Sequence, residues 1–87
     1  MRIKEIAPNI AEVRFRNDQE GNTYILANRK APVAAIISGP GGGDGAFRTS
    51  RGQNAIVTKH INKWLNGTEA IVKAQLFFDN LLEGRKG

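Results

Sequence analysis

Six basic residues in the middle of the chain are the side chains best suited to chemistry, and that chemistry is the binding of phosphate groups. Residues 21–68 contain these six against one acid, Asp44, whereas the segments before and after are balanced in charge. The middle therefore carries the whole net charge of +5. Gathered on one face, such cations would attract nucleic acid or an acidic protein, whereas scattered cations are an ordinary solvated surface. The six candidate nucleic-acid-binding residues are Arg29, Lys30, Arg48, Arg51, Lys59 and Lys63.

Four of these cations fall close together along the chain. Lys59 and Lys63 are one helical turn apart within Ala55–Leu65, so a helix there would place both on one side. Residues 48–51 precede that helix and offer arginine, threonine and serine donors for phosphate oxygens. Taken singly, each lysine fits the solvated side of an amphipathic helix equally well.

A glycine-rich run, Gly39-Pro40-Gly41-Gly42-Gly43-Asp44-Gly45, lies just upstream. A phosphate-binding P-loop needs a lysine followed by serine or threonine after its last glycine, and Ala46-Phe47 stands there instead. The looser dinucleotide pattern also fails, because no helix is predicted to begin at the run. We therefore expect either a plain connector or a binding loop whose glycines let the backbone approach a partner.

Catalytic, cofactor and metal chemistry have little support in the sequence. The absence of cysteine removes disulfides, thiol chemistry and cysteine-type zinc sites. The carboxylates are spread singly, with no pair placed for acid–base work. His60 is the only histidine, and we expect it to be buried and hydrogen-bonded. We predict a protein that is not an enzyme and uses no cofactor or metal.

Apolar residues suggest two further contact sites. Phe47, between the glycine run and the basic segment, is a candidate for contacting a base or a partner pocket, whereas Trp64 is expected in the core. The last predicted helix is apolar over more than one face, which a surface helix rarely needs. The residues that widen its apolar arc, a candidate partner or dimer interface, are Val72, Leu76 and Phe77.

The elements that must position these residues are strands first and helices second. With 87 residues, of which 40% are hydrophobic, we predict one α+β domain with one modest core. Residues 1–38 read mainly as strands, 39–53 as a glycine-rich basic loop and 54–84 as two helices. We expect an antiparallel sheet of three or four strands, with both helices packed on one face. The expected strands are Arg2–Ile6 (an edge), Ala11–Arg16, Thr23–Ala27 and the most buried, Val33–Ile37.

The alternation of Val13 and Phe15 with arginines favours a strand there over a short helix spanning Pro8–Arg16. Turn formers at 17–22 then predict a β-hairpin. In the second half, helical spacing predicts Ala55–Leu65, ended by the left-handed cap of Asn66-Gly67. A second helix is expected to start at the Thr68 cap and stop at Gly84.

Part of the chain resembles a group of small, largely uncharacterised bacteriophage proteins. The resemblance rests on Lys30-Ala31-Pro32-Val33-Ala34, Phe47-Arg48-Thr49-Ser50 and Thr58-Lys59-His60-Ile61-Asn62-Lys63-Trp64-Leu65, which look like that group's "TPVA" strand, short "yrT" strand and "TxxHINxWL" helix start. It covers residues 30–65, with the glycine run as an insertion. It implies a phage-type accessory protein and little chemistry.

A fainter likeness links Gly21–Ser38 to the hairpin of Phd/YefM-type antitoxins, whose segment reads "EG…RRGKPVA…". The first helix of that family and its acidic toxin-wrapping tail have no counterpart in this sequence.

These observations lead to two functional hypotheses of different classes. The first is a phage-type protein that binds nucleic acid or a nucleoprotein complex through the central cations. The second is a protein-binding inhibitor, such as an anti-CRISPR or antitoxin, that meets an acidic host protein or forms a homodimer through its last helix. No predicted segment is long and apolar enough to span a bilayer, so we expect a soluble cytoplasmic protein, which would lie in the host cytoplasm if it is viral.

Overall fold

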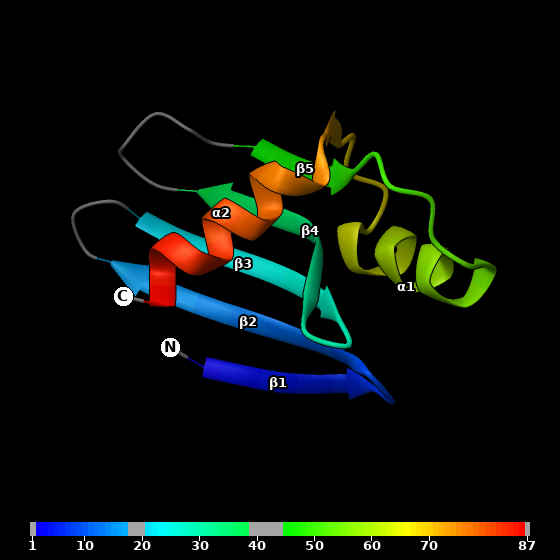
Figure 1. Cartoon of the computed structure of the whole chain (residues 1–87), viewed down its shortest axis with the longest axis horizontal. Helices are drawn as coiled ribbons and strands as arrows, with labels where there is room; N and C mark the ends of the chain where they lie inside the picture. Colours follow the sequence, from blue (N-terminus) through cyan, green and yellow to red (C-terminus); the bar gives the residue numbers. More distant parts are fainter. Residues whose placement is uncertain (1, 18–20, 39–44, 87) are drawn as a thin grey trace.

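The structure, a computed structural model, describes residues 2–17, 21–38 and 45–86, with side chains for residues 2–15, 21–38 and 45–81. In these ranges six strands form one sheet, with one helix between the last two strands and one after them (Figure 1). The α+β class is therefore confirmed, but the expected three or four strands are too few. The elements are β1 (Arg2–Ala7), β2 (Ile10–Asn17), β3 (Gly21–Asn28), β4 (Ala31–Ser38), β5 (Gly45–Thr49), α1 (Ala55–Leu65), β6 (Ile71–Lys73) and α2 (Gln75–Lys86).

The first five strands form an antiparallel meander, and each pairs with the next strand in the chain. The strand predicted from the alternation around Val13 is confirmed as β2. Val13 lies opposite Ile25, which lies opposite Ala35 on β4, so the three share one face. Side chains alternate between the faces of a strand, so Leu26 and its partner Ala34 point to the opposite face.

The two helices cover opposite faces of this sheet, not one face as predicted. Val57, Ile61 and Leu65 of α1 pack with Leu26 and Ala34 on one face. On the other face, Phe78 of α2 packs with Val13, Ile25 and Ala35 (Figure 1). The arrangement follows from β3 and β4, whose central side chains are buried on both faces and so need a cover on each.

The loop predicted over 39–53 is wrong in its second part, because Gly45–Thr49 is strand β5. Its pairing with β4 buries Ala46 on the α1 face, while Phe47 joins the α2 face. The phage-type resemblance did imply a short strand at this place. Residues 39–44 of the glycine run lie outside the described residues.

The predicted helix from Thr68 is also wrong at its start, because Ile71–Lys73 is strand β6 and α2 begins at Gln75. Branched Ile71 and Val72 favour extended backbone, and β6 pairs in parallel with β5, so the sheet is mixed. Helical spacing still holds for Phe78 and Leu81, which pack on the sheet. At its other end α2 runs to Lys86, beyond the stop predicted at Gly84.

The Gln75 side chain explains why α2 starts where it does. Its Oε1 accepts a hydrogen bond from Thr49 Oγ1 at 2.7 Å, and its Nε2 donates to the Pro32 carbonyl at 2.6 Å. Gln75 therefore ties the first turn of α2 to both β4 and β5. A local sequence pattern does not predict such contacts, because they join residues that are far apart in the chain.

Helix α1 has the predicted bounds and a cap at each end. The Asn54 side chain accepts from the Val57 N–H at 2.9 Å, as an N-cap residue does. Asn66 takes the left-handed conformation, with φ 52°, which confirms the predicted ending. In the part of the chain that the structure describes, no helix is long and apolar enough to cross a membrane.

Candidate nucleic-acid interface

Helix α1 presents one buried and one exposed side. Val57, Ile61 and Leu65 are buried, whereas Lys59 and Lys63 are exposed to solvent. The helix contains no acidic residue that could neutralise them. The two lysines therefore give the outer side of α1 a positive charge.

Arg48 joins this surface from the neighbouring strand. It lies on β5, on the face of the sheet that α1 covers, because its cross-strand partner is Ala34. Its Nη1 donates a hydrogen bond to Asn62 Oδ1 on α1 at 3.1 Å. Asn62 is the residue next to Lys63, so this bond brings the β5 cation to the edge of the helical pair.

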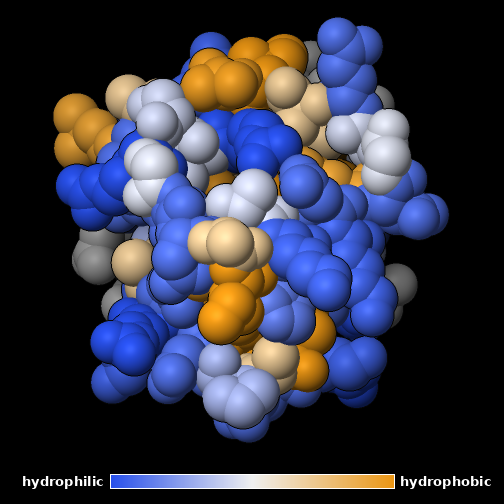
Figure 2. Space-filling view, turned by 90° about the vertical axis from the view of Figure 1, so that its right-hand side faces the viewer, coloured by the Kyte–Doolittle hydropathy of each residue, from blue (hydrophilic) through white to orange (hydrophobic). Residues whose placement is uncertain are grey.

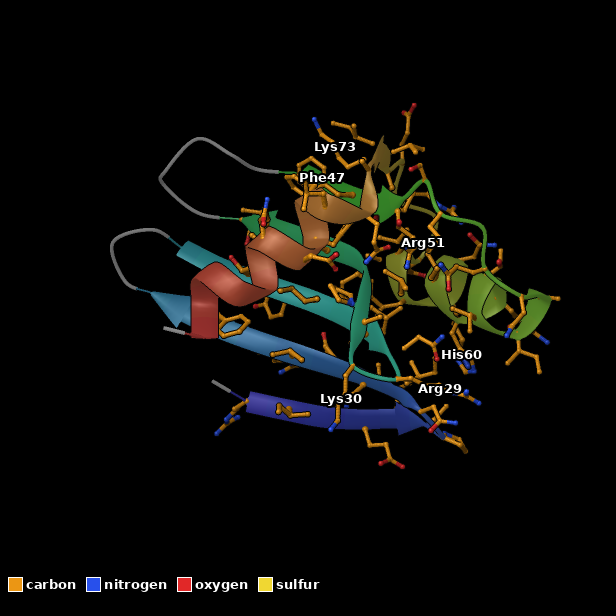
Figure 3. All side chains as sticks on the ribbon, viewed as in Figure 1. Arg29, Lys30, Phe47, Arg51, His60 and Lys73 are labelled. Atoms are coloured by element: carbon orange, nitrogen blue, oxygen red, sulfur yellow. The ribbon has the colours of Figure 1, made fainter. Side chains whose placement is uncertain are left out.

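Arg51 is exposed in the connection between β5 and α1. Its N–H donates to Thr49 Oγ1 at 3.1 Å, and its carbonyl accepts from Gln53 Nε2 at 3.2 Å. These bonds hold the backbone around Arg51 between the strand and the helix cap, and Figure 3 shows its side chain on the α1 side of the molecule. We call Arg48, Arg51, Lys59 and Lys63 the α1 patch.

The remaining two predicted cations occupy the tip of the β3–β4 hairpin. Arg29 and Lys30 are exposed and have φ angles of 50° and 70°, a pair of positive values that a tight two-residue hairpin needs. The Arg29 N–H also donates to the Asn9 carbonyl at 2.8 Å. In Figure 3, Arg29 points toward the α1 end of the molecule and Lys30 points away from it. Lys30 thus points away from the end of the molecule that carries α1.

Figure 2 looks onto the end of the molecule that α1 forms. The surface there is largely hydrophilic, with apolar colour at the top of the view and in smaller groups at its left edge, near its centre and below. A hydrophilic end with four cations on one strand–helix unit is a surface to which phosphates can bind.

Phe47, predicted to contact a base or a partner pocket from a loop, lies on strand β5, and its half-buried ring packs beside the α2 core. Phe47 packs against Phe77, with ring centroids 5.2 Å apart, and the Phe77 and Phe78 rings are nearly perpendicular, with centroids 5.1 Å apart. Phe77 is therefore half-buried within the α2 core, whereas Val72 and Leu76 of the same predicted interface are exposed. Of the three, Val72 and Leu76 are the fully exposed ones, and a role for any of them in an interface stays a prediction.

His60, expected to be buried, is partly buried on α1, and Figure 3 shows it at the α1 end of the molecule. Trp64 packs against the α1 core, as predicted, and its Nε1 donates to Glu12 Oε1 at 3.3 Å. Among the described residues, no group of three or more histidine, aspartate or glutamate side chains could hold a metal ion.

A second group of polar side chains, on the strands, was not singled out from the sequence. Arg14 lies opposite Tyr24 on β3, and its guanidinium carbon is 5.7 Å from the centre of that ring. Arg2 on β1 lies opposite Arg14 in turn. These arginines were not selected because residues 1–20 have no net charge. The alternation along β2 does place Arg14 on the face of the sheet opposite to Val13.

The bacteriophage and antitoxin resemblances imply a type of small protein but no arrangement of site residues. They stay predictions. The structure adds positions for the residues that carry them: the "TxxHINxWL" segment spans most of α1, and the "TPVA" segment forms the buried start of β4. Comparison of the chain with models of protein families, with curated proteins and with solved structures gives no match.

Proposed function

We propose that this protein binds nucleic acid, alone or within a nucleoprotein complex, and that the α1 patch supplies the phosphate contacts. The observation that carries the proposal is the Arg48–Asn62 hydrogen bond, which joins a β5 cation to the exposed side of α1. Because of it, cations separated by up to 15 positions in the sequence belong to one strand–helix unit. Arg29, at the same end of the molecule, extends the set, and no catalytic step is involved.

The chemistry of the α1 patch suits phosphate in two ways. Arg48 and Arg51 carry planar guanidinium groups, which can donate two parallel hydrogen bonds to one phosphate. Lys59 and Lys63 act as point charges one turn apart along α1, which attract the backbone of a nucleic acid without reading its sequence. We therefore expect the protein to bind nucleic acid with little preference for its base sequence.

Binding to a fluorescently labelled DNA duplex is expected to weaken steeply as salt rises. With four phosphate contacts, a plot of log affinity against log salt concentration should have a slope of about −4. Lys63→Gln should make this slope shallower by about one unit, because one contact is lost. The measurement is fluorescence anisotropy at several salt concentrations.

Lys73→Gln is the matched control for Lys63→Gln, since it makes the same change of net charge on an exposed residue of β6. The Lys73 ammonium lies 5.8 Å from the centre of the Phe77 ring, on the α2 side. Its replacement should leave the salt slope unchanged. An absence of binding at low salt, or a slope near zero, would remove the proposal.

A second candidate function is the binding of a protein partner through β6 and the start of α2. Ile71, Val72 and Leu76 expose large apolar side chains close together in the chain. β6 stands at the end of the sheet order, so within the described residues its outer edge has no neighbouring strand. Exposed apolar surface beside a strand edge is where another chain can add a strand.

The geometry of β6 limits how such a partner could pair. The Lys73 carbonyl accepts from the Ser50 N–H at 2.8 Å, so the backbone groups of Lys73 point toward β5. Since these groups alternate along a strand, those of Val72 point outward. One residue offers too few hydrogen bonds for a stable pair, so the affinity would have to come from the apolar side chains.

For this second candidate, the double substitution Val72→Thr with Leu76→Ser tests the apolar surface while keeping a branched residue in the strand. If the protein is a homodimer through this surface, light scattering should give twice the 9.5 kDa chain mass for the natural sequence and the single mass for the variant. If the partner is a host protein, a pull-down with the natural chain should retain it and the variant should not. A monomer that retains no partner would exclude this candidate.

A further inference from the structure

We propose that the part of the sheet face beside α1 binds single-stranded nucleic acid, with bases stacking on Tyr24 and phosphates held by Arg2, Lys4 and Arg14. The inference rests on the proposed function, because it names a class of nucleic acid. It uses residues other than the α1 patch, however, so the two can fail separately.

The strand register places the aromatic ring and the arginines in one row. Arg2 lies opposite Arg14, Arg14 opposite Tyr24, and Tyr24 opposite Ile36. Tyr24 and Leu26 are two positions apart on β3, so their side chains point to the same face of the sheet. The row therefore lies on the face on which α1 packs. Ile36 touches the α1 core, and the row runs outward from there toward β1.

Exposure along this row increases away from α1. Ile36 and Tyr24 are half-buried, the Arg14 side chain is 44% exposed, and Arg2 is exposed. One end of the row thus packs against the core beneath α1, and the rest forms an open shelf that runs from Tyr24 to the β1 edge. An aromatic ring beside cations on an open sheet is an arrangement suited to stacking a base while holding its phosphate.

The charge of this shelf favours a polyanion over a protein or an uncharged ligand. Lys4 adds a third exposed cation on the same face, opposite Glu12. Among the described residues of β1 and β2, Glu12 is the one acidic residue on this face, and its carboxylate already has two partners. It accepts from Arg14 Nη2 at 3.1 Å and from Trp64 Nε1 at 3.3 Å, and its side chain is only 12% exposed.

The remaining acid of β1 does not reduce this charge. Glu5 pairs with Ala11, so it points to the other face of the sheet, away from Lys4 and Arg2. Three cations therefore share the shelf with one acid, which pairs with Arg14 and also accepts from Trp64 of α1, so the net charge of the shelf is +2. This excess is what a phosphate backbone complements.

The aromatic ring decides between single-stranded and duplex nucleic acid. A base can lie on the Tyr24 ring only if it is free of its own stack, which single strands allow and intact duplexes do not. The Arg14 guanidinium lies over the Tyr24 ring, 5.7 Å from its centre, so a base stacking on that side would take its place, and the displaced guanidinium would remain within reach of the phosphate of that base. Stacking and phosphate binding are thus coupled at neighbouring residues.

Anisotropy titrations with two labelled probes test the inference: a thymidine 10-mer, and the same backbone with abasic sites in place of the bases. The natural protein should bind the thymidine oligomer more tightly. Tyr24→Leu should weaken that binding about five- to 150-fold, the range for losing one stacked base, and leave binding of the abasic oligomer unchanged. Tyr24→Phe keeps the ring and should bind as the natural protein does.

A second measurement uses the natural protein, so it does not depend on how the variants fold. Irradiation with a 10-mer containing 5-iodouracil should cross-link the base to Tyr24, as mapped by mass spectrometry of the digested complex. Equal affinity for the two probes, or cross-links confined to the α2 side, would overturn the inference and leave phosphate binding by the α1 patch standing. No binding of either probe or of duplex at low salt would instead overturn the proposed function.

Discussion

Replacing Phe78 by alanine is expected to lower the free energy of unfolding by about 3–5 kcal/mol, the range for truncating a buried phenylalanine. Phe78 is 0% exposed and is the largest fully buried side chain among the described residues. It holds α2 against Val13, Ile25 and Ala35, and its ring also meets the edge of Phe77. Since small domains have about 5–15 kcal/mol of stability in all, the variant should be close to unfolding at room temperature.

Urea unfolding followed by circular dichroism measures this loss as a lower midpoint at unchanged slope. Leu76→Ala is the control, because Leu76 lies on the same helix but is 65% exposed. That change should stay within about 0.5 kcal/mol, as surface substitutions do. Equal losses in the two variants would mean that α2 does not pack on the sheet through Phe78.

The elements predicted correctly are those whose signals lie within a short stretch of sequence. Helix α1 has an apolar stripe, no acid and an Asn-Gly ending, all within 13 residues, and its bounds agree with the prediction. Strand β2 alternates in the same local way, and β4 has a continuous apolar run. Each of these patterns marks an apolar side that must be buried, whichever elements of the fold cover it.

The incorrect predictions concern β5 and β6, which become strands through pairing with distant parts of the chain. Phe47 is opposite Ala35 on one side and Ile71 on the other, contacts that span 12 and 24 positions. The residues at 71–78 also fit a helical period, so local spacing alone could not exclude a longer helix. The Gln75 contacts with β4 and β5, which set the true start of α2, depend on the tertiary structure.

The candidate site shows the same division. The sequence placed Lys59 and Lys63 together, because one helix carries both. The approach of Arg48 to α1 depends on the β4–β5 register and on its hydrogen bond to Asn62, and no local sequence pattern predicts either. The shelf around Tyr24 was missed because residues close in space, such as Arg2 and Tyr24, belong to different strands.

The α1 patch and the Tyr24 shelf depend on one feature, which is how α1 sits on the sheet. The helix brings Asn62 to Arg48 on one flank, and on the other flank Trp64 binds the carboxylate of Glu12. Without this docking the α1 patch would lose its strand cation, and Glu12, which pairs with Arg14 of the shelf, would lose its second hydrogen bond, from Trp64. A substitution in the core beneath α1 therefore tests stability and both proposed surfaces together.

Ile61→Ala is expected to lower the free energy of unfolding by about 2–5 kcal/mol, because truncating a buried isoleucine leaves a cavity. Ile61 is 1% exposed and lies in the core between α1 and the sheet, with Leu26, Val33 and Ala34. Urea unfolding followed by Trp64 fluorescence, which reports on the α1 side, should show an earlier midpoint. Nucleic-acid binding should fall with the same midpoint, since α1 carries the patch.

Ile56→Ala makes the same chemical change on the same helix at a position that is 71% exposed. It should leave stability unchanged or raise it by a few tenths of a kcal/mol, because alanine forms helices better than isoleucine. The comparison separates helix formation from helix docking. If Ile61→Ala were as mild as Ile56→Ala, α1 would not be held by its apolar side. The Arg48–Asn62 and Trp64–Glu12 contacts could not then be fixed features of either proposed surface.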